Sequence, residues 1–338
     1  MRAYSIVITN PTTGEIIRPP SLAALKLPAT WTSWANGQNY PSAQNIEIDI
    51  PVSTEALPVQ GGFIRIWGIS VAEISQAQNL NGMNIAIYAG MQKGLPLANP
   101  KQYGLIAQGQ IQQAFGNWIN EDMTLDLILQ APTGFNDSPI NLSFNWQAGQ
   151  QLSDALKATL STAFPNYTLN ISINQNLVQT HTEPGYYGKV SDLAQYVRNR
   201  SIAIIGKDYP GVDIAISGKT IDVFDNTTQK NPKQIAFQDM IGQPTWINGT
   251  SVQVKFVIRS DLHIGDVIKF PQAVTTTTAQ SNAALATNQK VTFQGLFQIG
   301  GPDGLIRHVG NFRQEDAGSW NTIVNAYALN PAFKQIAA

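Results

Sequence analysis

Alternation of apolar and polar residues near the C-terminal end of the chain predicts short β-strands. In the stretch from Pro244 to Leu329, Val252, Val254, Phe256 and Ile258 alternate with the polar Gln253, Lys255 and Arg259, as in a half-buried strand. Gly265 and Asp266 then form a turn signal, because glycine adopts the positive φ that a tight connection needs. Further apolar runs follow at 291–299, 304–312 and 319–329. The pattern predicts a small antiparallel barrel or sandwich.

The first 140 residues carry the same kind of pattern. Ile46, Ile48 and Ile50 alternate with Glu47 and Asp49, which predicts a strand with one buried and one wet face. Further strands are expected at 62–69, 83–90, 104–115 and 123–131, with only a helical turn or two between 70 and 80. The segment before Ile46 is expected to be mostly irregular, because it contains Pro11, Pro19, Pro20, Pro28 and Pro41. The prediction is one β-domain with an extended N-terminal arm.

The period changes in the middle of the chain. Leu152, Leu156 and Leu160 recur every four residues and predict a helix that Pro165 helps to end. A second helix is expected at 191–200, with Ser191 as its N-cap and Leu193, Tyr196 and Val197 facing inward. Short strands are expected around these helices, at 168–173, 201–206, 212–217 and 219–225. This region is predicted to be an α+β insertion between two β-domains.

These patterns divide the chain into a first β-domain at 1–140, an α+β domain at 141–229 and a second β-domain at 230–338. Both β-domains place a strand ending in glycine before a polar turn, a tryptophan (Trp118, Trp320) and a closing strand, which favours an internal duplication. The threonine-rich stretch 271–290 is too long for a hairpin loop. Two readings of it remain open: a loop that gains order from a partner, or a surface insertion that contacts nothing.

Composition narrows the function classes. Only 13% of the 338 residues are charged, about half the usual share, so much of the surface is expected to be covered in an assembly. The formal net charge of −1 leaves no basic footprint for phosphates, so stable nucleic-acid binding is not expected. The chain has no cysteine, which suits a reducing compartment. No secretory leader and no apolar run long enough for a membrane span is visible, so no membrane insertion is expected.

Candidate chemistry is sparse, and no cofactor or metal is expected. His181 and Glu183 share a polar loop but lack the spacing of a metal or acid-base motif, so a solvated loop is the favoured interpretation. Acid pairs occur at 121–122 and 315–316, and both pairs are expected to be turn residues that bond local backbone. Asp303 lies in a GGPDG turn that has neither the spacing nor the lysine of a phosphate-binding loop. The chain is not expected to be an enzyme.

The seven tryptophans admit two interpretations. They can fill cores and interfaces, or they can form a stacking platform for sugars. Apart from Trp31 and Trp34 they do not cluster along the chain, so core or interface positions are favoured. A β-rich carbohydrate-binding or adhesion protein with exposed aromatic residues therefore remains the alternative function, with a glycoside hydrolase a distant third.

Two sets of stretches along the chain combine short strand patterns with glycine turns. The first set is WGISVAEISQAQNLNGMNIAIYAGM, GLIAQGQIQQAF and MTLDLILQA, and the second is IGQPTWINGTSVQVKFVIRSDLHIGDVIKF, followed by LIRHVGNFRQEDAGSWNTIVNAYAL. They resemble, respectively, the N-terminal and C-terminal parts of baseplate hub proteins of contractile-tailed bacteriophages. The stretch 271–290 departs from the compact hairpin of the family. The matched pattern implies structural or assembly roles for Gly242, Pro244, Gly265, Asp266, Gly310 and Trp320.

The resemblance implies a fold and an assembly. The fold is mainly β with an α+β insertion, in which two small antiparallel tube-like β-barrels flank the middle domain. Three chains form a homotrimeric ring that acts as a symmetry adaptor between a hexameric tail tube and a trimeric spike. The expected partners are tail tube or tube-initiator proteins, the spike protein and other baseplate proteins. The expected location is the virion tail baseplate, assembled in the cytoplasm of a bacterial host.

Overall fold

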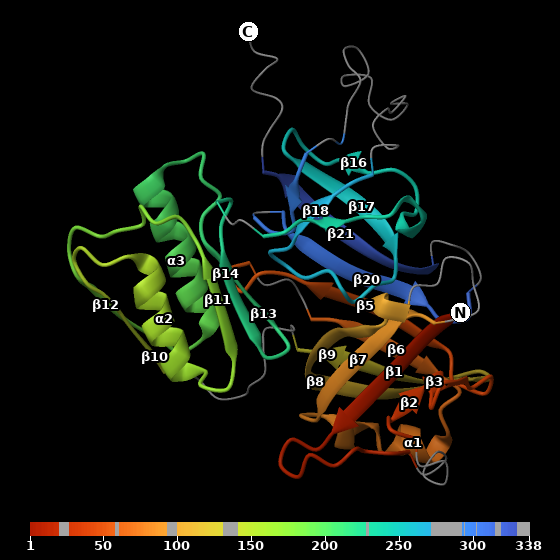
Figure 1. Ribbon diagram of the computed structural model, residues 1–338. Helices are drawn as coiled ribbons and strands as arrows, with labels where there is room; N and C mark the ends of the chain where they lie inside the picture. Colours follow the sequence, from red (N-terminus) through yellow and green to blue (C-terminus); the bar gives the residue numbers. More distant parts are fainter. Residues whose placement is uncertain are drawn as a thin grey trace.

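The chain is mainly β, with three α-helices in the part that the structure describes (Figure 1). This computed structural model describes residues 1–19, 27–57, 61–92, 100–130, 141–227, 230–271, 293, 295–301, 303–314 and 319–329. The stretch 272–290 and the acid pair Glu315-Asp316 lie outside these residues. None of the helices in the described part is both long and apolar enough to cross a membrane.

In the part of the chain that the structure describes, the first segment contains nine strands and one short α-helix. Ile46, Ile48 and Ile50 are buried while Glu47 and Asp49 are half-buried, so the predicted alternation is confirmed. A capping box at Ser70 and Glu73 begins the short helix, and a 3-10 turn at Ala77–Leu80 follows it. The elements are β1 (Arg2–Thr9), β2 (Trp31–Thr32), β3 (Trp34–Ala35), β4 (Gln38–Asn39), β5 (Ile46–Val52), β6 (Phe63–Trp67), α1 (Val71–Ser75), β7 (Asn84–Met91), β8 (Gly104–Ile119) and β9 (Asp122–Leu129).

The expectation of an irregular N-terminal arm is wrong for Arg2–Thr9, which form a strand. Strand β1 pairs with β7 along its whole length and also with β2. Tyr4, Ile6 and Ile8 are fully buried in the core of the first segment. These residues alternate with Ser5, Val7 and Thr9, and the first proline comes only at position 11. The period-two pattern therefore outweighs the prolines that follow it.

The middle segment packs two helices against two small sheets. Its elements are β10 (Leu142–Trp146), α2 (Leu152–Ala163), β11 (Thr168–Ser172), β12 (Glu183–Tyr187), α3 (Val190–Ile205), β13 (Asp213–Ser217) and β14 (Thr220–Phe224). Strand β10 pairs with β12, and β14 lies between β11 and β13. Leu152, Leu156 and Leu160 are buried in a core of their own, as the four-residue spacing predicts.

Helix α3 differs from the prediction at both ends. Its N-cap is Lys189 and not Ser191, which lies in the first turn. The stretch 201–206, expected to be a strand, continues the helix to Ile205 and ends at Gly206, which has a φ of 128°. Ser201 lies four residues after Val197, on the buried face of the helix. Its hydroxyl accepts a hydrogen bond from the Val212 N–H at 2.9 Å, which favours the helical conformation at this position. The apolar run at 201–206 thus extends the helix.

The third segment confirms the strand that opens it. Val252, Val254, Phe256 and Ile258 are buried while Gln253 and Lys255 are exposed. Arg259, expected on the polar face, is instead 4% exposed, because two carboxylates, Asp261 and Asp239, accept hydrogen bonds from its guanidinium. The strands are β15 (Lys233–Gln234), β16 (Thr245–Trp246), β17 (Ser251–Val257), β18 (Val267–Lys269), β19 (Phe297–Gln298), β20 (Leu305–Asn311) and β21 (Trp320–Ala328).

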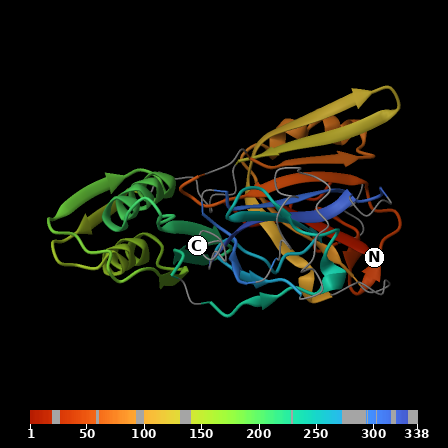
Figure 2. The same cartoon turned by 90° about the horizontal axis from the view of Figure 1, so that it is seen from above.

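One large sheet joins the first and third segments (Figures 1 and 2). Its connecting pair is β5 with β20, from Val52 opposite Ile306 to Glu47 opposite Asn311. The strands that the structure describes form an open path from β15 to β2, with β16 and β17 to one side of β21, and not a closed barrel. The core of the first segment also takes in Ile258 and Trp320 from the third.

Candidate functional site

The middle and third segments meet around one aromatic ring. Phe224, the last residue of β14, is 1% exposed and packs into the core of the third segment. A Cβ added to Gly265 would lie 2.8 Å from the Phe224 ring, and one added to Gly300 would lie at the same distance. The ring therefore lies in a slot between two glycine backbones. Gly265 has a φ of 90°, as the turn signal in the sequence predicts.

A buried ion pair lies beside this slot. Arg198 of α3 donates from Nη1 to Asp213 Oδ1 of β13, and both side chains are less than 10% exposed. Asp213 Oδ2 also accepts the Gly301 N–H at 3.0 Å. Burial raises the pKa of the Asp213 carboxyl, while Arg198 and the Gly301 amide favour its charged form. The Asp213 carboxylate thus links α3, the sheet that contains β13, and the third segment.

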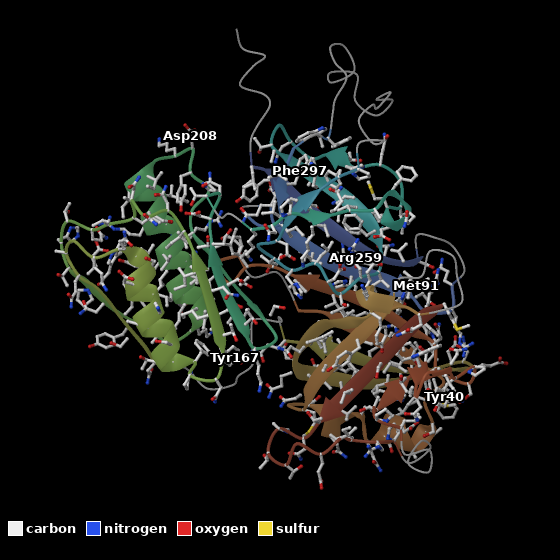
Figure 3. The ribbon with its side chains drawn as sticks, viewed as in Figure 1. Tyr40, Met91, Tyr167, Asp208, Arg259 and Phe297 are labelled. Carbon is white, nitrogen blue, oxygen red and sulfur yellow. The ribbon has the colours of Figure 1, made fainter. Side chains whose placement is uncertain are left out.

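Arg259 makes a second buried cluster (Figure 3). Its guanidinium donates to both oxygens of Asp261 at 2.7 Å and to Asp239 Oδ2 at 3.2 Å. The same Asp239 oxygen accepts a bond from Gln102 Nε2 at 2.8 Å. Gln102 lies just before β8, so this cluster ties the third segment to the first.

Asp266, one of the residues predicted from the sequence, lies directly after Gly265 and directly before β18. Its Oδ2 accepts the His263 N–H and the Lys233 ammonium, both at 2.7 Å. Burial opposes the charge of Asp266, but the bonds from His263 and Lys233 outweigh it, so the pKa of the carboxyl lies below its usual value. Asp266 therefore acts as a fixed anion that closes the 263–266 turn.

The other predicted residues lie in two further places. Gly310 and Trp320 are paired across β20 and β21, and a Cβ on Gly310 would overlap the carbonyl oxygen of Ser319. Trp320 is 2% exposed, and its ring meets Phe312 edge to face. Gly242 has a φ of 77° in an exposed loop, with Pro244 buried two residues later. Gly265 and Asp266 lie where the middle and third segments meet, whereas Gly242 and Pro244 lie in a separate loop.

A small cleft opens at the junction of the first, middle and third segments of the chain. It is lined by the end of β5, the start of β8, the β13–β14 hairpin, the 260–264 loop and β20. Most of its wall is aliphatic, including Ile106, Ile216 and Ile264. Two histidines, His263 and His308, also reach it. His308 is fully buried, which lowers its pKa to about 3, and its Nδ1 lies 2.9 Å from Thr322 Oγ1. The cleft thus holds a neutral imidazole.

Glu55 adds a buried carboxyl to the same junction. It lies just after β5, is 3% exposed, and its backbone N–H donates to Ile214 O of β13 at 2.8 Å. The next residue, Ala56, packs into the core of the middle segment. Burial raises the pKa of Glu55 from its usual 4.5 to about 8. The 54–56 segment therefore joins the first segment to the middle one through this backbone bond and Ala56, and its buried carboxyl is neutral at pH 7.

Stability is expected to fall as pH rises because of Glu55. The folded protein keeps this carboxyl protonated while the unfolded chain releases the proton, so the free energy of unfolding decreases between pH 4.5 and about 8. Glu55→Gln should remove this contribution, on the order of a few kcal/mol. Urea unfolding at pH 5 and at pH 8 measures it. Equal losses of stability in the wild type and the variant would contradict the burial of a neutral carboxyl.

Gly265→Val is expected to lower the free energy of unfolding by about 1–3 kcal/mol through backbone strain, with the overlap on Phe224 adding to the loss. Gly242→Val is the matched control, because Gly242 also has a positive φ but nothing within 4 Å of an added Cβ. Thermal unfolding of both variants compares strain alone with strain plus overlap. A Gly265→Val protein that melts with the wild type would show that this turn is misplaced.

The candidate catalytic residues are held by structural partners. Glu183 begins β12 and is not in a solvated loop as expected: it pairs with His181 at 2.7 Å and with Arg200 at 2.6 Å. Glu121 lies in the β8–β9 turn as predicted, whereas Asp122 begins β9, and both side chains are exposed. Asp303 accepts bonds from Asn248 and Ser251. In the part of the chain that the structure describes, no three metal-ligating side chains come together.

The tryptophans do not form a platform in the described residues. Trp31, Trp146 and Trp320 are at most 2% exposed, whereas Trp118 is 66% exposed on β8. Trp118 and Trp320 therefore do not correspond as the proposed duplication expected, since one ends a strand in solvent and the other begins a strand in a core. The large exposed aromatic side chains lie on three elements: Phe115 and Trp118 on β8, Tyr186 on β12 and Phe237 in a 3-10 turn.

Sequence reasoning missed Arg198, Asp213, Phe224 and Glu55. The one available signal was a charged residue on the apolar face of a helix, because Arg198 directly follows Val197 in a region expected to face inward. An inward-facing arginine requires a carboxylate partner. Its partner, Asp213, begins β13 beyond the end of the helix, and the periodicity of the helix does not reveal this pairing.

Comparison with known proteins gives no family. No protein-family profile matches the chain, and no curated protein matches it. Among solved structures, a tail protein from Neisseria meningitidis MC58 aligns with a TM-score of 0.46 and 11% identity, covering 97% of this chain and 96% of that one. The 43 kDa tail protein of prophage MuSo2 from Shewanella oneidensis aligns with a TM-score of 0.47 and 7% identity, covering 97% of each chain.

A third solved structure is a component of the type VI secretion system of E. coli, described as structurally similar to T4 bacteriophage tail proteins. It aligns with a TM-score of 0.45 and 10% identity, covering 86% of this chain and 75% of that one. With TM-scores below 0.5, these alignments assign no family to the chain.

Proposed function

We propose that this chain is a structural hub subunit of a phage tail baseplate. In the proposal three copies form a ring, and the ring adapts a hexameric tail tube to a trimeric spike. The sequence resemblance supplies the hub, the trimer and the partners. The role is mechanical and not catalytic, and the subunit is located in the virion tail after assembly in the bacterial cytoplasm.

A repeated strand order is the observation that carries the proposal. In the first segment β5 pairs with β6, β6 with β9 and β9 with β8, all antiparallel. In the third segment β16 pairs with β17, β17 with β21 and β21 with β20, also antiparallel. In each segment an early hairpin (β5–β6 or β16–β17) lies beside a later one (β8–β9 or β20–β21). The second strand of the early hairpin pairs with the last strand of the later hairpin. This shared order supports two related units in one chain.

Two related units per chain would resolve a symmetry mismatch. A ring of three chains presents six similar units, which match a sixfold tube on one side and a threefold spike on the other. In this proposal each unit contributes one tube-like barrel to the ring, at 1–140 and 230–338, with the 141–229 domain outside it. The barrels would be completed by contacts made on assembly.

The joint between the two units supports a rigid ring. Strands β5 and β20 pair over six consecutive residue pairs. On the same strands Arg307 donates to both carboxylate oxygens of Asp49, at 2.6 Å from Nε. A continuous ladder resists bending between the units better than a flexible linker. A displacement of one unit would thus be passed to the other.

Mass in solution and a low-resolution image test the proposal. Sedimentation velocity is expected to give a species of three chains, and negative-stain images a ring with six similar lobes. A species of one chain at every concentration would overturn the trimer. The carbohydrate-binding alternative predicts a change in tryptophan fluorescence on titration with sugars. The hub proposal predicts none.

A further inference from the structure

The β8–β9 hairpin ends in two large apolar side chains exposed to solvent. Trp118 is 66% exposed and Ile119 is 67% exposed. Among the residues that the structure describes, the strand ladder beyond Thr124 joins β8 and β9 only to each other, because the last pair that joins β6 to β9 is Trp67 with Thr124. The indole nitrogen of Trp118 donates to Asn120 O at 2.9 Å, which orients the ring over the turn. Figure 2 shows this hairpin projecting from the sheet, away from the middle segment.

An apolar cleft lies at the opposite end of the same strand. The junction cleft described above is walled chiefly by Val52, Leu105, Ile106, Ile216, Leu262 and Ile264. These side chains come from four elements, and the cleft is open at the surface of the junction. An aromatic or aliphatic side chain placed there would bury apolar surface on both partners.

The hairpin tip cannot reach the cleft of its own chain. Ile106 lines the cleft and Trp118 ends the hairpin, and both belong to β8. Twelve residues of extended strand separate two side chains by about 40 Å. Only a second copy of the chain can bring a tip to this cleft, and the resulting contact is head-to-tail.

Charge also favours this pairing. The tip carries Glu121 and Asp122, both exposed. The cleft includes Gly218, in a turn where the next residue is the exposed Lys219. The acidic residue that lines the cleft, Asp222, is already paired with Lys230 at 3.3 Å. An acidic tip therefore meets a rim beside Lys219, which forms no ion pair with the residues that the structure describes.

We propose that the hairpin tip at residues 118–122 docks into the junction cleft of a neighbouring copy. Two different surfaces of the same chain form this contact, so repeating it generates a closed ring when the rotation between copies fits. The inference rests on the proposed ring and names the contact that holds it together.

A disulfide between copies tests the docking. The chain contains no cysteine, so Ile119→Cys combined with Ser217→Cys leaves only the designed pair. A disulfide requires Cα atoms within about 7 Å, which the docking predicts between copies and β8 excludes within one chain. Mild oxidation should give covalent species of two and three chains in denaturing gels. Ile119→Cys with Ser161→Cys, a residue exposed on α2 and outside the cleft, is the matched control.

The mass of the wild-type protein separates two kinds of failure. A trimer whose designed pair cross-links no better than the control would overturn the docking and leave the hub proposal standing. A single-chain species without cross-links would overturn both. As a second measurement, Trp118→Ala is expected to shift the trimer toward single chains without changing its far-UV circular dichroism. A Trp118→Ala protein that stays fully trimeric would contradict the docking.

Discussion

Arg198→Ala is expected to lower the free energy of unfolding by about 3–5 kcal/mol. The change leaves Asp213, which is 2% exposed, without its cation inside the protein. Asp213 must then stay buried as an unpaired charge or take up a proton, and either choice destabilises the folded state. It also weakens the acceptor of the Gly301 N–H, so the loss reaches the third segment. Urea unfolding followed by circular dichroism measures the difference.

Two variants keep this prediction specific. Arg200→Ala removes a neighbouring arginine whose side chain is 30% exposed and is expected to change stability by less than about 1 kcal/mol. Arg198→Met together with Asp213→Leu removes both charges and is expected to recover much of the loss, since two buried charges are replaced by apolar groups. Wild-type stability in Arg198→Ala alone would rule out the buried pair.

Trp320→Ala is expected to destabilise the protein by about 3–5 kcal/mol. The ring is 2% exposed and lies in the core of the first segment although it belongs to the third. Its loss opens a cavity beside Phe312 and Tyr4, whose rings also meet edge to face. The cavity lies between two segments, so both are expected to unfold at a lower temperature in one transition. Differential scanning calorimetry shows whether they do.

Trp118→Ala is the matched control for Trp320→Ala. Its ring is 66% exposed, so the folding stability of the single chain is expected to change by less than about 0.5 kcal/mol. The comparison is made at a concentration where chains do not associate, so that docking does not contribute. Equal losses from the two substitutions would mean that the burial of the two rings has been assigned wrongly.

Local patterns predicted much of the fold because their cause lies within a few residues. The alternation in β5 and β17 reports which side chains face a core, and the four-residue spacing in α2 reports a helical stripe. The positive φ at Gly265 also follows from a local requirement. For the same reason the patterns failed where a neighbour decides the outcome. The run at 201–206 has strand character, yet Ser201 and Val212 hold it in a helix.

Only the tertiary structure determined which strands and side chains that are distant in the sequence pair with each other. A strand pattern shows which face is buried but not which strand lies beside it, so nothing in the sequence of β5 points to β20, whose ion pair to Asp49 spans 258 positions. Arg259 was expected in solvent because its sequence position lies on the polar face, whereas Asp239 and Asp261 make its burial favourable. The slot for Phe224 likewise needs two glycines from separate turns. The sequence determined the elements and their faces through short-range periodicity. The joints between segments depend on contacts over long separations, whose geometry exists only once the chain has folded.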